Sequence, residues 1–432
     1  MFKFKFTEKL IHPVIFMILL PVISSAAGKA DNTEIFIFKK KEVNTGLTYS
    51  PNKEREEVRS AASYDFEELT TGAAQFRWSN RNWNILRSKQ EEWNYQLEAG
   101  PFWGNGNIAD STSVYNYVAD HKVAGVRGIL SGGYLNRYYY DNKNYTIVSV
   151  DGVAKFNYYR QDSEGLLTDS NQVTLDHSSR TDETKFRAGF QAKGGWGIGR
   201  LNYINHYVAA AGLLEKYYPE RIFSESEIMM LSREIGRIKH GREIRAGHDR
   251  EKEIISLKEF LNWKMLLEVP SDILNYWELT EFRPRLKGSR IEFGPFFNYY
   301  NREPDFVYGG YVQFENVKYC NNEWNRNFSV NMSYNGYKHH DWLLMEVAAG
   351  WSYYPDLKSE LTFGLKYVPG MVVNSFENPE PVRHSFIPYI EYFSQINSRY
   401  RMEAELALRI APVEQFIVPG PRFSVSIYKS RY

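Results

Sequence analysis

The sequence has very little cysteine: Cys320 is the single one among 432 residues. One cysteine excludes an intramolecular disulfide and a multi-cysteine metal site, and we expect Cys320 to be a small apolar residue of a strand. Long apolar runs are also lacking, because no segment after the first 27 residues has 18 consecutive apolar residues. We therefore predict no transmembrane helix in the mature chain.

Neither sign of charge is in excess, since 53 Lys and Arg residues nearly cancel 52 Asp and Glu residues. Net charge therefore argues neither for nor against nucleic acid, and we predict no nucleic-acid partner. Aromatic residues, by contrast, make up 16% of the chain, with 32 Tyr and 27 Phe. This abundance suits the wall of a membrane protein, where Tyr and Trp settle at the two interfaces.

Residues 1–27 have the form of a secretory signal peptide. Lys3, Lys5 and Lys9 precede an apolar core that starts at Val14, and small residues offer a cleavage site before residue 28. The apolar core is too short to span a bilayer comfortably. No lipobox cysteine accompanies it, so we predict an exported protein that is not a lipoprotein.

Strict alternation of apolar and polar residues marks the segment 398–410. One side carries Met402, Ala404, Leu406, Leu408 and Ile410, and the other carries Arg401, Glu403, Glu405 and Arg409. This period of two is that of a strand with one face in an apolar medium and one in a polar medium. It recurs along the chain in segments of about 10 residues with aromatic ends, which is typical of an outer-membrane β-barrel.

We count four such strands within 91–199 and eight within 283–432. We assign 28–90 to a polar periplasmic segment, partly helical or disordered, and leave open whether 73–90 adds a strand. Bacterial barrels have even strand numbers, so we predict about 12 antiparallel strands, with 10 or 14 as neighbours. The strand segments are 92–103, 127–140, 145–159, 184–197, 285–300, 306–320, 323–336, 342–354, 359–369, 384–395, 398–410 and 421–431.

Between these two groups, residues 200–282 change to a helical period of three to four residues. Ser224 and Glu227 have the spacing of a capping box, and Ile228 begins an apolar stripe that continues to Ile238. Pro270 ends a third helix, and a short fourth helix follows. We predict a helical insert of three to four helices.

The predicted connections should alternate between short periplasmic turns and longer external loops. This places the helical insert and the N-terminal segment in the periplasm. The predicted turns are 141–144, 321–322, 355–358 and a turn near Asn397. The predicted external loops are 104–126, 160–182, 301–305, 337–341, 370–383 and 411–420.

The passage from strand to insert carries a resemblance. Gly195, Gly197, Gly199 and Arg200 lead into a helix, followed by SESEIMMLSREIGRI (224–238), an Arg-rich link and a third helix. This pattern resembles outer-membrane barrels common in Bacteroidota that carry a helical insertion after their first strands. The resemblance covers about 90–432 and implies an outer-membrane location, but no firm activity.

The last strand is similar to the recognition signal of the barrel-assembly machinery, because Phe423, Val425 and Ile427 alternate and Tyr432 is a terminal aromatic. The expected partners are therefore outer-membrane lipids, this machinery during biogenesis, and a possible periplasmic protein.

Charged residues on the polar faces of the strands are predicted to line the lumen. They form either an ion-pair network that stiffens the barrel or a constriction that selects solutes by charge. The candidates are Glu98, Lys185, Arg187, Lys193, Glu292, Glu346, Lys366, Arg401, Glu403, Glu405 and Arg409.

The helical insert has a basic link that offers a second candidate site. Its arginines either lie on a solvated, internally paired face or contact an acidic periplasmic partner or the cell wall. The candidates are Arg233, Arg237, Arg242, Arg245 and Arg250.

No catalytic, cofactor or metal residues are assigned. Neighbours on a strand point to opposite sides, which disfavours a metal site at 339–341 (His-His-Asp). The run 194–199 (GGWGIG) lacks the βαβ context of a dinucleotide site. We predict a narrow channel or a transport or export barrel with a helical docking element. The alternatives are a structural or partner-binding barrel without conductance and, less favoured, a barrel hydrolase.

Overall fold

A computed structural model gives the arrangement of most of the chain. The predicted signal peptide lies outside the residues that it describes. These residues are 37–59, 63–112, 114–169, 172–241, 250–280, 283–301, 305–338, 340–373, 382–397, 399–411 and 420–431.

Fourteen antiparallel strands form a closed barrel in which each strand pairs with its sequence neighbours and β1 pairs with β14. The first six are β1 (Phe38–Arg59), β2 (Ser63–Ile85), β3 (Lys89–Thr112), β4 (Tyr115–Tyr139), β5 (Asn144–Asp169) and β6 (Thr174–Tyr203). The remaining eight are β7 (Leu286–Tyr300), β8 (Phe306–Tyr319), β9 (Trp324–Tyr337), β10 (His340–Tyr353), β11 (Ser359–Val372), β12 (Arg383–Gln395), β13 (Tyr400–Arg409) and β14 (Gly420–Arg431).

The predicted strand number of 12 is wrong by two, because β1 and β2 occupy most of the segment assigned to a periplasmic extension (28–90). The predicted strands correspond to β3–β14. The reason lies in β1, where the outward apolar set is short: Leu47 and Tyr49 are 67% and 44% exposed, and strongly charged sequence follows them. The alternation in β1 is therefore too brief to identify a strand.

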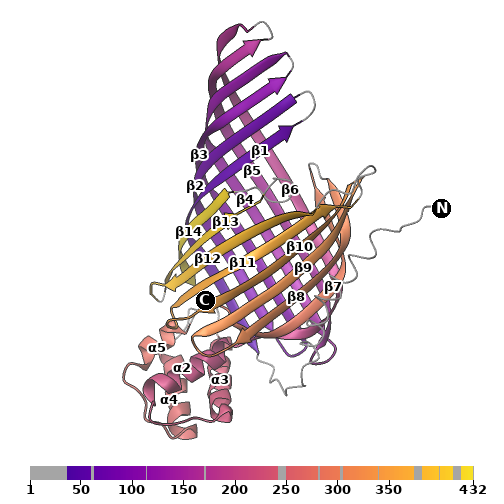
Figure 1. The fold of residues 1–432 in the computed structure, drawn as a ribbon. Helices are drawn as coiled ribbons and strands as arrows, with labels where there is room; N and C mark the ends of the chain where they lie inside the picture. The colour runs from indigo at the N-terminus through magenta and orange to yellow at the C-terminus, as the bar shows by residue number, and fades with distance from the viewer. Residues whose placement is uncertain are drawn as a thin grey trace, which may run out of the picture.

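The first six strands extend well beyond the rest of the wall (Figure 1). They have 22 to 30 residues each, whereas β7–β14 have 10 to 15. The pairing of β6 with β7 stops at Gly189, and that of β1 with β14 stops at Asn52. We call the projecting part of β1–β6 the sheet extension.

The sheet extension replaces two predicted external loops, 104–126 and 160–182, which are mostly strand. Both faces of this sheet carry polar residues, so the sequence lacks the apolar alternation that identifies a half-buried strand. The β5–β6 ladder carries the pairs Arg160–Asp182 and Arg180–Asp162, with closest N–O distances of 2.9 and 3.4 Å.

The helical insert between β6 and β7 confirms the predicted change of period. It comprises α2 (Asn205–Tyr217), α3 (Glu225–His240), α4 (Arg250–Lys264) and α5 (Ile273–Leu279). The Ser224–Glu227 capping box is present, and Leu213, Leu231 and Leu257 lie in a common buried core. Among the described residues, no helix is long and apolar enough to cross a membrane.

The insert lies at one end of the barrel, together with the short turns and the described chain termini (Figure 1). The predicted turn 321–322 falls between β8 and β9 as expected, and so do the other predicted turns between their strands. Cys320 is exposed in this turn and is not the strand residue that was expected.

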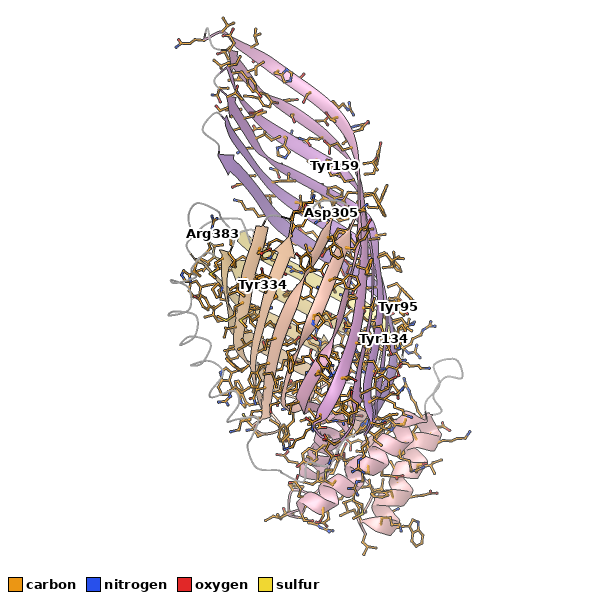
Figure 2. The ribbon with its side chains drawn as sticks, turned by 90° about the vertical axis from the view of Figure 1, so that its right-hand side faces the viewer. Tyr95, Tyr134, Tyr159, Asp305, Tyr334 and Arg383 are labelled. Carbon is orange, nitrogen blue, oxygen red and sulfur yellow. The ribbon has the colours of Figure 1, made fainter. Side chains whose placement is uncertain are left out.

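The outer and inner faces of the wall differ as the alternation predicted. On β13, Leu406 is 49% exposed on the outside, whereas Arg401 is 1% exposed inside. Tyr95, Tyr134 and Tyr334 lie on the wall between the insert and the sheet extension, and Asp305 and Arg383 lie nearer the rim away from the insert (Figure 2).

Candidate functional site

The end of the barrel that carries the insert is crossed by a segment of the insert itself. Arg283, between α5 and β7, places its Nη2 atom 3.0 Å from Glu403 Oε1 on β13. Along the ring, β13 lies six strands from β7, close to the opposite wall of a 14-stranded barrel. The Arg283–Glu403 ion pair therefore links the insert to the far side of the mouth.

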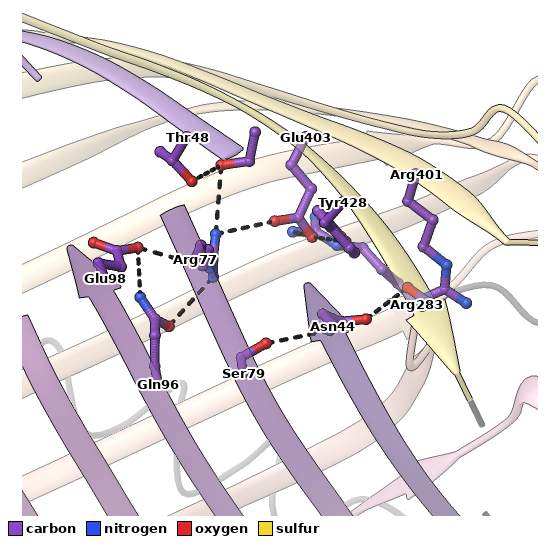
Figure 3. A network of polar contacts seen from close by, with 12 residues as sticks. Asn44, Thr48, Arg77, Ser79, Gln96, Glu98, Arg283, Arg401, Glu403 and Tyr428 are labelled. Carbon is purple, nitrogen blue, oxygen red and sulfur yellow. Dashed lines mark hydrogen bonds and ion pairs between the residues drawn. The ribbon is translucent and has the colours of Figure 1, made fainter. Parts of the chain in front are cut away.

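Glu403 gathers further partners from neighbouring strands (Figure 3). The Tyr428 hydroxyl donates a hydrogen bond of 2.7 Å to Glu403 Oε1, and Arg77 Nη1 lies 3.9 Å from Glu403 Oε2. Arg77 Nε also lies 3.7 Å from Glu98 on β3. One carboxylate thus connects β2, β13, β14 and the insert.

A second polar cluster fixes the seam where the barrel closes. Glu42 on β1 lies 3.2 Å from Arg401 Nη1 on β13, and both side chains are buried. Asn44 donates to Glu42 at 2.8 Å and to Ser79 at 3.3 Å, and it accepts from Ser430 at 2.6 Å. The hydrogen bonds join β1 to its neighbours β2 and β14.

The rest of the crossing segment is held against the rim. Arg285 donates to the carbonyls of Asn321 and Asn322 at 2.8 and 2.7 Å. Gln395 on β12 donates to the carbonyl of Glu278 in α5 at 3.1 Å. Because these contacts flank Arg283, the segment has several anchors on the barrel.

The walls also meet through a buried ion pair inside the barrel. Arg137 Nε on β4 lies 3.0 Å from Glu292 Oε2 on β7, and the Tyr145 hydroxyl donates to the same oxygen at 3.1 Å. Arg137 and Glu292 are each 3% exposed. Burial of two charges is tolerated only when they are paired and hydrogen-bonded, as here.

An apolar cluster adds to the closure at the same end. Phe38 on β1 stacks on Tyr203 on β6 with ring centroids 4.9 Å apart, and Trp83 and Ile85 of β2 complete the cluster. Phe38 also approaches His206 of α2, with ring centroids 5.7 Å apart. Side chains of strands that do not pair with one another are therefore in contact across the mouth.

Part of the interior remains open above these contacts. A cavity of about 320 Å³ lies between β6 and β11 and is lined by Lys193, Glu346 and Asn331, among others. A smaller cavity of about 200 Å³ lies where α2 meets the rim, beside Arg283 and Arg285. The cavity at the rim shows that the crossing segment borders unfilled space.

The predicted lumen residues fall into different places. Glu98, Glu292, Arg401 and Glu403 belong to the networks described above, and Lys193 and Glu346 line the larger cavity. The others lie apart: Lys366 over the Tyr389 ring, Glu405 opposite Glu391, Arg409 against the Gly420 carbonyl, and Lys185 and Arg187 on the sheet extension.

Sequence reasoning missed the partners of these residues. Glu42 and Arg77 lie in the segment that was not assigned to the barrel. Arg137 lies on a predicted strand but is not among the predicted lumenal residues, and Arg283 lies just after the predicted insert. The sequence Arg-Pro-Arg at 283–285 is the signal that could have indicated Arg283. Proline restricts the backbone between the two arginines, whose side chains can then bind the rim of the barrel.

The predicted arginines of the insert are engaged where they are described. Arg237 Nη2 lies 2.5 Å from Glu234 Oε1, and Arg250 pairs with Glu278 of α5. Arg233 is exposed on α3, and Arg242 and Arg245 lie outside the described residues. Within the described parts of the chain, no group of three His, Cys, Asp or Glu side chains is placed to hold a metal ion.

A histidine pair joins α2 to α3 within the insert. The Nε2 atoms of His206 and His240 are 3.3 Å apart, so one ring donates and the other must be neutral to accept. Burial, together with the nearby charges of Lys39 and Lys239, lowers the pKa of His240 to about 4. The contact between the two rings therefore contains His240 in its neutral form at pH 7.

The pH dependence of the insert follows from this shift. An unfolded histidine has a pKa of about 6.5, so the unfolded insert binds more protons between about pH 6.5 and 4. The free energy that holds α2 against α3 should therefore decrease as the pH falls from about 6.5 to 4, by about 3 kcal/mol at most. Hydrogen exchange of α2 and α3 at pH 7 and pH 4.5 measures the effect.

The control for this experiment is His177→Gln, which alters a histidine on the sheet extension far along β6 from the insert. It should keep the pH dependence, whereas His240→Gln should reduce it. Equal pH dependence in all three proteins would show that other groups are responsible.

The chain is a closed, all-antiparallel β-barrel with a small helical insert. No protein-family model and no curated protein matches its sequence.

Several solved outer-membrane barrels are similar over most of their length. The translocator domain of autotransporter NalP from Neisseria meningitidis is 8% identical, with 98% of this chain and 96% of that chain covered and a TM-score of 0.28. A Pseudomonas aeruginosa FadL homologue is 9% identical, covering 91% and 89%, with a TM-score of 0.28. OprB from Pseudomonas putida is 7% identical, covering 90% and 91%, with a TM-score of 0.30.

Proposed function

We propose that this protein is an outer-membrane barrel that passes a small solute through a lumen closed at rest by its insert. The location is supported by the even strand number, the apolar outer face and the polar interior. Short turns face the periplasm in such barrels, so the insert and the N-terminus belong there and the sheet extension belongs outside the cell. The insert also supports the resemblance to Bacteroidota barrels.

The observation that carries the transport proposal is the Arg283–Glu403 ion pair. It ties a segment of the insert to the far wall at 3.0 Å, and the rim cavity of about 200 Å³ lies beside it. A segment held across the mouth by side-chain contacts can be released without breaking the wall. A displaceable strap fits gating by a periplasmic partner or by the solute itself.

Arg283→Ala is expected to raise the conductance of the purified barrel in a planar bilayer. A charge-assisted hydrogen bond contributes about 1.5–3 kcal/mol, so its loss should shift the closed-to-open ratio by about tenfold or more. Deletion of 205–280 with a short linker should open the mouth further. Single-channel recording measures both changes.

Arg237→Ala is the matched control, because it removes an ion-paired arginine of the insert that lies away from the mouth. It should conduct like the wild type. Absence of conductance in the wild type, the Arg283→Ala variant and the deletion variant would contradict the proposal. It would favour the alternative of a partner-binding barrel.

That alternative has one observation of its own. Ile255, Trp263 and Leu266 are 53%, 81% and 83% exposed on and just after α4. Exposed apolar residues that form a contiguous patch mark contact sites, and these three lie within 12 residues of one another in the sequence. The partner role therefore stands as the second candidate function.

A further inference from the structure

We propose that the outer wall binds an anionic phospholipid, with its acyl chains in a groove across β8–β13 and its phosphate at Lys318 and Arg326. The inference rests on the proposed location of the barrel in a bilayer and on no part of the proposed transport activity.

The groove is a wide apolar hollow in the outer face. Its volume is about 1090 Å³, which is at the upper limit for small-molecule pockets. Small residues form its floor, since Ala349 and Pro388 face outward between larger side chains. The large outward side chains of the lining are Phe314, Phe328, Trp351, Phe363, Leu365, Ile390, Leu406 and Leu408. Long hydrocarbon chains fit such a lining better than a compact solute.

The register shows that the groove climbs the wall diagonally. Arg326 lies two residues from the start of β9, whereas Leu406 lies six residues from the start of β13. One row of paired residues connects them: Arg326, Trp351, Phe363, Ile390 and Leu406. The groove thus runs from the rim near the insert toward the middle of the wall.

The lower end of the groove carries two cations side by side. Lys318 and Arg326 are direct partners in the β8–β9 ladder, and both are exposed on the outer face. Like charges directly opposite each other destabilise a sheet. In the described part of the chain, neither side chain forms an ion pair with an acidic residue. A bound phosphate would offset the repulsion and accept charge-assisted hydrogen bonds from both.

The level of this cation pair fits a lipid headgroup. Trp324 begins β9 two residues before Arg326, and its ring packs on Tyr353 with centroids 4.6 Å apart. Aromatic side chains of this kind mark the interface of a bilayer. Headgroup phosphates lie at that level, and the acyl chains extend from it along the groove.

The test is native mass spectrometry of the full chain in detergent, titrated with dioleoyl-phosphatidylglycerol. We expect the wild type to hold the lipid, and Lys318→Ala/Arg326→Ala to bind it about tenfold more weakly. Ala349→Trp, which fills the floor, should weaken binding to a similar degree. Inorganic phosphate and dioleoylglycerol supply the headgroup and the chains separately, and each should bind more weakly than the whole lipid.

Matched controls lie on other parts of the outer wall. Lys429→Ala removes an outward cation near the same rim on β14, and Leu97→Trp adds bulk on β3. Both should bind like the wild type, and circular dichroism should show that every variant is folded. Unchanged affinity in the cation-pair and Ala349→Trp variants would overturn the proposal.

A dimer that the Ala349→Trp substitution abolishes would overturn it as well, because a second copy would then fill the groove. Binding is measured without conductance. A barrel that binds the lipid and never conducts would therefore contradict the transport proposal alone.

Discussion

Arg137→Ala is expected to destabilise the folded barrel by about 3–5 kcal/mol, because it leaves the carboxylate of Glu292 buried without its cation. Glu292 is 3% exposed, and its other hydrogen bond comes from the neutral Tyr145 hydroxyl. The nearby Arg290 is already ion-paired with Glu315. The contact joins β4 to β7 through the interior, so no backbone pairing replaces it. Urea unfolding of the barrel in detergent, followed by tryptophan fluorescence, measures the loss.

The matched control is Arg160→Ala, which breaks an exposed arginine–carboxylate pair on the sheet extension. No measurable change is expected, since exposed pairs are solvated and screened. The double variant Arg137→Met/Glu292→Leu should regain most of the stability, because an apolar pair needs no neutralisation. Equal decreases in the free energy of unfolding for Arg137→Ala and Arg160→Ala would show that the interior ion pair stabilises the barrel no more than an exposed pair does.

The wall could be predicted from the sequence wherever one face is apolar and the other polar. β13 shows this best, because Leu406 and Leu408 are exposed outside while Arg401 is buried inside. The helical insert was equally accessible, since the Ser224–Glu227 capping box and the apolar spacing of α3 are local signals. Both features depend on residues close together in the chain.

The missing strands and the sheet extension could not be predicted in the same way. In the sheet extension the pairing of β5 with β6 continues to Thr168 and Thr174, although this part of the sequence is polar on both faces. Backbone hydrogen bonds hold such strands, and these bonds leave no pattern in the side chains. The two uncounted strands lie mostly in the closed wall, where β1 pairs with β14 from Val43 to Asn52, and the outward apolar set of β1 is too brief to identify a strand.

The side-chain contacts across the mouth and the interior could not be predicted from the sequence for a different reason. Arg283 and Glu403 are 120 residues apart in the sequence, and Arg137 and Glu292 are 155 apart. Alternation identifies which charges face the interior, but the curvature of the closed wall decides which of them meet. The partners of a lumenal charge therefore require the strand order and register, which only the folded barrel supplies.

Leu406→Arg is expected to impair membrane insertion by about 2–4 kcal/mol, because the proposed outer-membrane location puts this side chain in hydrocarbon near the middle of the bilayer. Leu406 is 49% exposed on the outer face and lies inside β13, six residues from its start. An arginine there would face hydrocarbon with no partner on the wall. Equilibrium unfolding of the protein reconstituted into phospholipid vesicles measures the cost.

Two comparisons make this result specific. Glu405→Gln alters the neighbouring residue, which faces the interior, and should leave assembly unchanged. Leu408→Arg should cost less than Leu406→Arg, because Leu408 is next to the end of β13 and nearer the rim, where a charge can reach water. Equal assembly of all three variants would mean that the outer face of β13 does not contact lipid, and the proposed membrane location would fail with it.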